Sequence, residues 1–109
     1  MIGLSKEGDL MPASSLRVVA RIKARPESVV EVRELLRGLV EPTRKESGCI
    51  SYELLQNTED PADFTFVEEW ESAAALESHA ASDHLKAIGP KLRPIVADTP
   101  DIRTYLVVN

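Results

Sequence analysis

The sequence predicts a ferredoxin-like α+β domain, a four-stranded antiparallel sheet with helices on one face. Three observations indicate this fold. Residues 16–24 alternate between apolar and polar side chains, as a half-buried strand does. Residues 26–40 place apolar side chains at helical spacing. Two strand patterns, a helical stretch and a last strand pattern then complete the order β-α-β-β-α-β in 109 residues, a length that fits one domain.

The first strand and the first helix follow from simple spacing. Every second residue of 16–24 is apolar, so this strand has one buried side. Pro26 suits the first turn of the next helix, where a missing N–H costs little. Glutamates crowd the early turns, where the helix dipole favours negative charge. We expect Pro42 to kink this helix near its end and Gly48 to stop it.

The middle of the chain predicts a β-hairpin followed by a short helix. Residues 49–56 and 64–70 have strand patterns, and residues 57–61 between them are rich in turn formers. Ser72 is suited to cap a helix over residues 73–81, because its hydroxyl can accept a hydrogen bond from a free backbone N–H.

The end of the chain predicts one more helix and the fourth strand. The helix is expected to begin near His84, and Pro90 and Pro94 should bend or interrupt it. A strand over residues 102–108 completes the sheet.

Helices on one side leave the other face of the sheet open. The open face mixes Val, Leu and Tyr with Arg and Glu, which suits contact with an identical sheet better than contact with water. We therefore expect a homodimer; the alternative is a monomer whose sheet tolerates a few exposed valines. The residues expected to face the helices are Leu16, Val18, Ala20, Ile22, Ile50, Tyr52, Leu54, Phe64, Phe66, Trp70, Ile102 and Leu106. Those expected on the open face are Arg17, Val19, Arg21, Cys49, Ser51, Glu53, Leu55, Thr65, Val67, Glu69, Arg103, Tyr105 and Val107.

The composition argues against several classes of protein. A net charge of −5 with scattered Lys and Arg argues against nucleic acid as a partner. No apolar run reaches the ~18–20 residues that cross a bilayer, so no membrane partner is expected. The single cysteine, Cys49, forms no intrachain disulfide and favours the reducing cytoplasm. Two histidines and one cysteine are poor material for a structural metal site, so no metal is expected. Residues 1–14 lack signal-peptide features and are expected to be an N-terminal extension of a domain over residues 15–109.

Four motifs between residues 46 and 87 resemble one family. They are E-S-G-C-I-S-Y at 46–52, F-V-E-E-W-E-S at 66–72, L-E-S-H at 76–79 and H-L-K-A at 84–87. Together they resemble the antibiotic biosynthesis monooxygenase family, in particular its quinol monooxygenases, over about residues 16–108. The resemblance implies a dimeric α/β barrel with two sheets packed back to back and a pocket between sheet and helices. It further implies oxidation of a small quinol or phenol by O₂ with no cofactor.

His79 is the candidate catalytic residue. It follows Leu76 by three positions on a short helix, so both side chains point to one side and His79 should face the sheet or the rim of the cleft. An imidazole gains and loses a proton near neutral pH, so it suits a general base for a phenolic substrate. The alternative is a structural histidine that hydrogen-bonds a strand or loop.

Five residues are candidates for binding the substrate, and each has a structural alternative. Trp70 and Phe66 would wall a flat aromatic ring or pack in the core. The hydroxyl of Tyr52 would orient the substrate or serve core packing. Glu68 shares the face of Trp70 and would contact the substrate or anchor a loop or helix end. His84 follows a helix cap and would stand near the entrance of the pocket or on the surface.

Three hypotheses for the function remain open. The first is a cofactor-independent monooxygenase in which His79 favours the anion of an aromatic substrate. The second is an isomerase or lyase-like enzyme for a phosphorylated or carbonyl compound, with Lys86, Lys91 and Arg93 as cationic candidates. The third is a non-catalytic dimeric module that binds a small apolar ligand. Haem degradation is disfavoured, because haem-degrading relatives carry an Asn on the first strand and residues 16–24 contain none.

Overall fold

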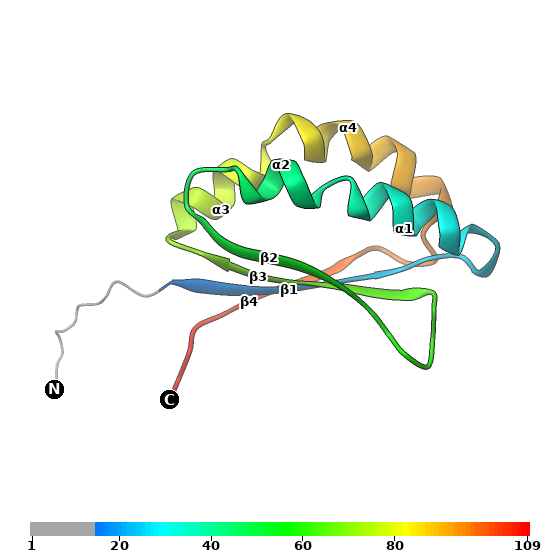
Figure 1. Cartoon of the computed structure of the whole chain (residues 1–109), viewed down its shortest axis with the longest axis horizontal. Coiled ribbons are helices and arrows are strands. Elements are labelled where there is room, and N and C mark those ends of the chain that lie inside the picture. The colour runs from blue at the N-terminus through cyan, green and yellow to red at the C-terminus, as the bar shows by residue number, and fades with distance from the viewer. Residues whose placement is uncertain (1–14) are drawn as a thin grey trace, which may run out of the picture.

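The computed structural model describes residues 15–109, so the expected extension 1–14 lies outside the described residues. The four strands form one antiparallel sheet in the order β2-β3-β1-β4, and the helices lie on one face of it (Figure 1). This confirms the ferredoxin-like prediction. The strands are β1 (Leu16–Lys23), β2 (Cys49–Gln56), β3 (Asp63–Trp70) and β4 (Asp101–Tyr105), and the helices are α1 (Val29–Arg37), α2 (Val40–Arg44), α3 (Ala73–Ala80) and α4 (Asp83–Leu92).

The first predicted helix is divided into α1 and α2, which separate at Gly38 and Leu39. Pro42 lies inside α2, one turn after the break. Proline has no N–H for the carbonyl four residues earlier, and its ring crowds that carbonyl, which here belongs to Gly38. The interruption therefore falls one turn before the proline, whereas the prediction placed a kink near the end of the helix. Gly48 does not stop α2, which ends at Arg44; it forms the turn into β2 with φ +87°.

A bulge in β2 reverses the predicted facing of two residues, Cys49 and Ile50. Cys49 pairs with Trp70 and Ser51 with Glu69, so the register shifts between Cys49 and Ser51. Because Trp70 faces the helices, Cys49 faces them too and packs against the core, whereas Ile50 is 50% exposed. The prediction that Ile50 faces the helices and Cys49 the open face was wrong, since strict alternation fails at a bulge.

The fourth strand is shorter and more exposed than predicted. It ends at Tyr105, which pairs with Arg17, and β1 begins at Leu16, so residues 107 and 108 have no partner strand in β1. Ile102 was expected to be covered by the helices, yet it is 65% exposed, and Leu106 is exposed as well. Ile102 lies in the edge strand, whose contacts are mainly with β1, and Leu106 follows the end of that strand.

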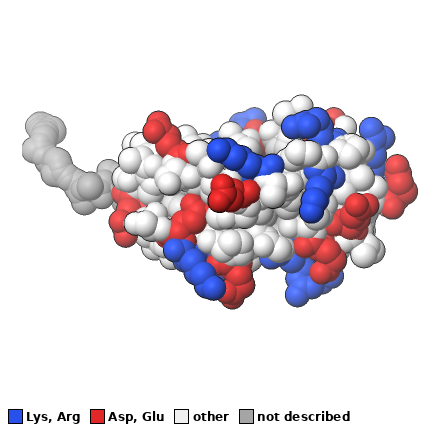
Figure 2. Space-filling model, turned by 90° about the horizontal axis from the view of Figure 1, so that it is seen from above, with Lys and Arg blue, Asp and Glu red and all other residues white. Residues whose placement is uncertain are grey.

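The core lies between the sheet and the helices. Its largest fully buried side chains include Trp70, Phe64 and Leu36. On the helix-covered side, Lys and Arg side chains are interspersed with Asp and Glu (Figure 2). Among residues 15–109, the structure has no helix whose length and hydropathy would let it cross a membrane.

The opposite face of the sheet has no helix on it (Figure 1). Val19 pairs with Val67 near the middle of this face, and Arg17 lies 3.5 Å from the carboxylate of Glu69. Val67 and Tyr105 are 38% and 46% exposed. The face thus carries the predicted mixture of apolar and charged side chains, and its pairing with a second copy stays a prediction.

Candidate functional site

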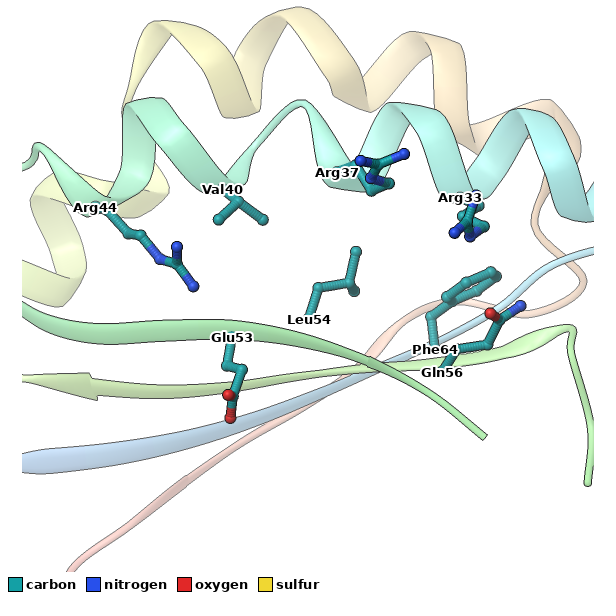
Figure 3. Close-up of a pocket in the computed structure, with 8 residues that line it drawn as sticks. All are labelled: Arg33, Arg37, Val40, Arg44, Glu53, Leu54, Gln56 and Phe64. Atoms are coloured by element: carbon teal, nitrogen blue, oxygen red, sulfur yellow. The ribbon is translucent and has the colours of Figure 1, made fainter. Parts of the chain in front are cut away.

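A cavity of about 420 Å³ lies between α1–α2 and the β2 side of the sheet (Figure 3). Leu54 and Phe64 point into it from the sheet, whereas Glu53 points to the opposite face. No histidine lines it, and neither does Trp70. Arginines and apolar side chains therefore make up most of the lining of this hollow beneath the helices. Its lining residues are Arg33, Arg37, Val40, Arg44, Glu53, Leu54, Gln56 and Phe64.

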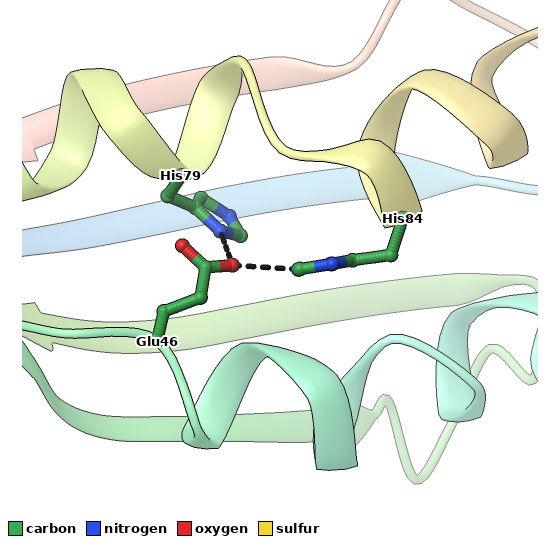
Figure 4. A group of neighbouring side chains, drawn as sticks. All are labelled: Glu46, His79 and His84. Carbon is green, nitrogen blue, oxygen red and sulfur yellow. Dashed lines mark hydrogen bonds and ion pairs between the residues drawn. The ribbon is translucent and has the colours of Figure 1, made fainter.

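The two histidines of the chain meet at a different place, around the carboxylate of Glu46 (Figure 4). His79 Nδ1 lies 2.8 Å and His84 Nε2 lies 2.6 Å from the same oxygen, Oε2. The side chain of His79 is 7% exposed, that of Glu46 15% and that of His84 22%. We call these three residues the Glu46 cluster. It is closed on the His79 side and partly open on the His84 side.

Two serine caps place the histidines. The hydroxyl of Ser72 accepts a hydrogen bond from the backbone N–H of Ala75 at the start of α3, and Ser82 caps α4 in the same way. His79 falls in the last turn of α3 and His84 in the first turn of α4. Because only two residues separate the helices, the corner between them brings both rings to one side.

A glycine brings Glu46 against α3. After α2 the chain turns toward β2 through Gly48, whose carbonyl accepts a hydrogen bond from the N–H of Glu71 at 2.8 Å. A Cβ built on Gly48 would lie 2.5 Å from the Cβ of Ala75. Only glycine permits so close an approach of this turn to α3, together with its positive φ. This approach sets Glu46 beside the histidines.

Hydrogen bonding assigns the protons of the Glu46 cluster. An ionised carboxylate only accepts, so both rings must donate to Oε2, His79 through Nδ1–H and His84 through Nε2–H. The free nitrogens are then Nε2 of His79 and Nδ1 of His84. The second belongs to the ring with the greater exposure, 22% against 7% for the side chain of His79.

The predicted substrate-binding aromatics form the floor of the cluster. The ring of Trp70 lies 4.6 Å from that of His79, and Tyr52 meets His79 edge-on at 5.5 Å. Tyr52 also stacks on Phe66 at 4.7 Å. Trp70 is 0% exposed, and Tyr52 and Phe66 are buried. The structure therefore brings the predicted site residues together, with the aromatic ones inside the core.

Glu68 is a buried carboxylate next to this floor. Its Oε1 accepts the indole N–H of Trp70 at 2.8 Å. Burial raises the pKa of Glu68, and the nearby charge of Glu46 acts in the same direction, while Trp70 and His79 act against them. Burial and the charge of Glu68 also raise the pKa of Tyr52, whose phenol thus stays protonated.

We expect the free energy of unfolding of Glu68→Gln, compared with that of the wild type, to increase as the pH rises. Glu68 has a higher pKa in the folded chain than its ordinary value of 4.5, so the folded state binds more protons and the wild type loses stability above that pH. Glutamine keeps an acceptor for Trp70 and carries no charge. Urea unfolding at several pH values from 4 to 8 measures the difference.

The exposed Glu77 on α3 provides the control for this prediction. Glu77→Gln removes one carboxylate without touching the core, so its stability relative to the wild type should change little with pH. Equal pH trends for the two variants would contradict the assignment of the effect to burial of Glu68.

Sequence reasoning missed Glu46 as a site residue. It lies 33 residues before His79 and 38 before His84, so no local spacing connects the three. Its place at the head of the first motif was the available signal. Lys86 and Lys91 on α4 and Arg93 just after it are exposed. None of them lines the 420 Å³ cavity or belongs to the Glu46 cluster, so the cationic candidates of the isomerase hypothesis do not converge on either.

Comparisons with known proteins agree on one family. The family model for antibiotic biosynthesis monooxygenase matches residues 15–91. The uncharacterized protein sll1783 of Synechocystis is 30% identical over 92 residues, which cover 84% of this chain and 63% of that protein. The "Putative monooxygenase Rv0793" of Mycobacterium tuberculosis is 37% identical over 71 residues, which cover 65% of this chain and 69% of that protein. This chain thus spans less than two thirds of the Synechocystis relative.

A solved structure supports membership of the same family. The crystal structure of an antibiotic biosynthesis monooxygenase matches this chain with a TM-score of 0.82 at 34% identity. The match covers 86% of this chain and 99% of the other. The likeness thus extends over most of this chain and nearly the whole of that structure.

Proposed function

Because the chain belongs to the antibiotic biosynthesis monooxygenase family, we propose that it is a cytoplasmic monooxygenase that oxidises a small quinol or phenol with O₂ and needs no cofactor. The resemblance of its motifs to this family is confirmed. The observation that carries the proposal is the partly exposed His84 joined to the buried His79 through one carboxylate oxygen. This arrangement suits removal of a proton from a hydroxyl group.

In the proposed mechanism His84 Nδ1 takes the phenolic proton. Glu46 holds the ring in the required tautomer and stabilises the positive charge that the ring gains, as a carboxylate does for a catalytic imidazole. His79 donates to the same oxygen and fixes its position. The substrate anion then reduces O₂ by one electron, the two radicals combine to a peroxide anion, and His84 returns its proton to give the hydroperoxide. Loss of water leaves the quinone, so one oxygen atom enters the ring and the other leaves as water.

Oxygen uptake with a simple naphthoquinol tests this function. We expect the wild type to consume one O₂ per substrate and to place one ¹⁸O atom from ¹⁸O₂ in the quinone. His84→Ala should lower kcat by about 100-fold to 10,000-fold, the usual contribution of a general base. Lys86→Ala, on the same helix and exposed, is the matched control and should keep full activity. Equal rates for the two variants would remove His84 from the mechanism.

We also propose that the open face of the sheet forms a homodimer. Val19 and Val67 give this face an apolar centre, and paired charges such as Arg17 and Glu69 surround it. Such a face is self-complementary under a two-fold axis. Burying it removes apolar surface that a lone chain of this size leaves in water.

Light scattering after size exclusion tests the dimer. The wild type is expected at twice the chain mass of 12.0 kDa. Val67→Glu should shift it to 12.0 kDa, because two buried carboxylates would then meet near the axis without partners. Val30→Glu, at an exposed position on α1, should leave the mass unchanged. A wild type of 12.0 kDa would end this proposal.

The arginine-lined cavity favours a second candidate, an enzyme for a phosphorylated or carboxylated small molecule. Arg33, Arg37 and Arg44 line one side of this cavity, and a guanidinium pairs with such anions through two parallel hydrogen bonds. Binding of inorganic phosphate by the wild type but not by Arg37→Ala would favour this candidate.

A further inference from the structure

We propose that the Glu46 cluster is a binding site for one divalent transition-metal ion, of which Zn²⁺ is the example tested below. Two imidazole nitrogens and one carboxylate oxygen are a common ligand set for such ions, and they leave further positions open to water. The three ligand atoms lie within 4.8 Å of one another. They come from α3, from α4 and from the turn after α2, so the fold itself assembles them.

The directions of the side chains support the site. His79 Nδ1 and His84 Nε2 are both aimed at Glu46 Oε2, at 2.8 and 2.6 Å (Figure 4). With bonds of about 2.0–2.1 Å to a tetrahedral ion, ligand atoms lie roughly 3.3 Å apart, so each imidazole nitrogen has to move roughly half an ångström or slightly more away from Oε2. The two imidazole nitrogens lie within 4.8 Å of each other. Each ring would then carry its proton on the other nitrogen. His84 starts a helix at the protein surface, so this small movement leaves the core in place.

The charge around the cluster supports a cation. Glu46 and Glu68 are carboxylates with little access to water, and the structure over residues 15–109 gives neither of them a Lys or Arg ion pair. Buried carboxylates are costly unless they are paired or bind a metal. A divalent ion would balance both. The aromatic rings of Trp70 and Tyr52 close the inner side, and the partly exposed His84 side gives the ion its path of entry.

The sequence led us to expect no metal, because a structural site needs four ligands from the protein. A site with three protein ligands and open positions needs only the residues present here. The inference goes beyond the proposed function and does not rest on it. It has a consequence for that function, however: an ion on His84 Nε2 places the ring proton on Nδ1, so His84 can no longer take a proton from the substrate.

Calorimetric titration of the chelator-treated full chain with Zn²⁺ tests the site. We expect one ion per chain, and a loss of affinity on the order of 100-fold or more in His84→Ala, since even an outer-shell partner contributes 10–100-fold. Glu46→Gln keeps the shape and an acceptor oxygen, so it provides a second variant that should also lose affinity. Thermal unfolding checks that both variants fold.

Two controls identify the ligands. Cys49 is the nearby thiol, and Cys49→Ser should bind Zn²⁺ as the wild type does. Co²⁺ should give visible absorption bands in the wild type that are absent in His84→Ala. Because both histidines of the chain belong to the Glu46 cluster, an imidazole-bound Co²⁺ can lie nowhere else. Binding that is lost in Cys49→Ser, or kept in His84→Ala and Glu46→Gln, would overturn the proposal, as would an absence of binding by the wild type.

The outcome separates this site from the proposed function. Zn²⁺ binding without oxygen uptake by the metal-free protein would support the metal site and contradict the monooxygenase. Oxygen uptake without Zn²⁺ binding would contradict the metal site and support the monooxygenase. If both are correct, Zn²⁺ inhibits oxygen uptake at the concentration at which it binds.

Discussion

Gly48→Ala is expected to lower the free energy of unfolding by about 2–4 kcal/mol. Two costs add at this position. The backbone has φ +87°, where a residue with a Cβ is strained, and the new Cβ would lie 2.5 Å from the Cβ of Ala75. Both atoms belong to short, inflexible groups, so the turn or α3 must move. Urea unfolding measures the loss.

Gly38→Ala is the matched control for this substitution. Gly38 has φ −63°, and a Cβ there would meet only the carbonyl oxygens of Leu35 and Glu34 at 3.4 and 3.6 Å, so alanine should change the free energy of unfolding by less than about 1 kcal/mol. In Gly48→Ala, the further change Ala75→Gly should remove the contact but not the backbone strain. Similar effects of alanine at positions 48 and 38 would show that the approach of the turn to α3 has no energetic importance.

His79→Ala is expected to lower the free energy of unfolding by about 2–4 kcal/mol as well as to abolish activity. His79 is packed between Trp70 and Tyr52, so alanine leaves a cavity beneath α3, and Glu46 loses a buried donor. Because the ring is buried, stability must be measured beside oxygen uptake.

His84→Ala is the comparison for His79→Ala. It removes a hydrogen bond to the same carboxylate oxygen, but from a partly exposed ring, so we expect a stability loss of only about 1 kcal/mol. Both variants should lose activity if the proposed function is correct. If His79→Ala were as stable as His84→Ala, the packing of His79 in the core would contribute nothing measurable.

Periodicity predicted the fold because most of its elements are set by local spacing. The hairpin of β2 and β3 and the serine caps of α3 and α4 follow from residues close together in the chain. The exceptions involve backbone events that a repeat pattern does not contain. The break at Gly38 arises from a proline one turn away, and the bulge after Cys49 changes which residues face the helices.

The candidate site was predicted less completely than the fold. Both histidines were chosen for their chemistry, and the structure brings them together. Glu46 could not be added from spacing, because its position beside them depends on the close contact of Gly48 with α3. The depth of Trp70 and Tyr52 in the core also depends on packing between segments far apart in the sequence.

Trp70 gives the molecule a natural optical probe. It is the single tryptophan, its indole N–H is bonded to Glu68, and its ring lies against His79. Its fluorescence therefore arises from one environment, directly beneath the Glu46 cluster. Changes in emission wavelength and intensity can follow unfolding and events at His79 in the unlabelled wild-type chain, without a substrate.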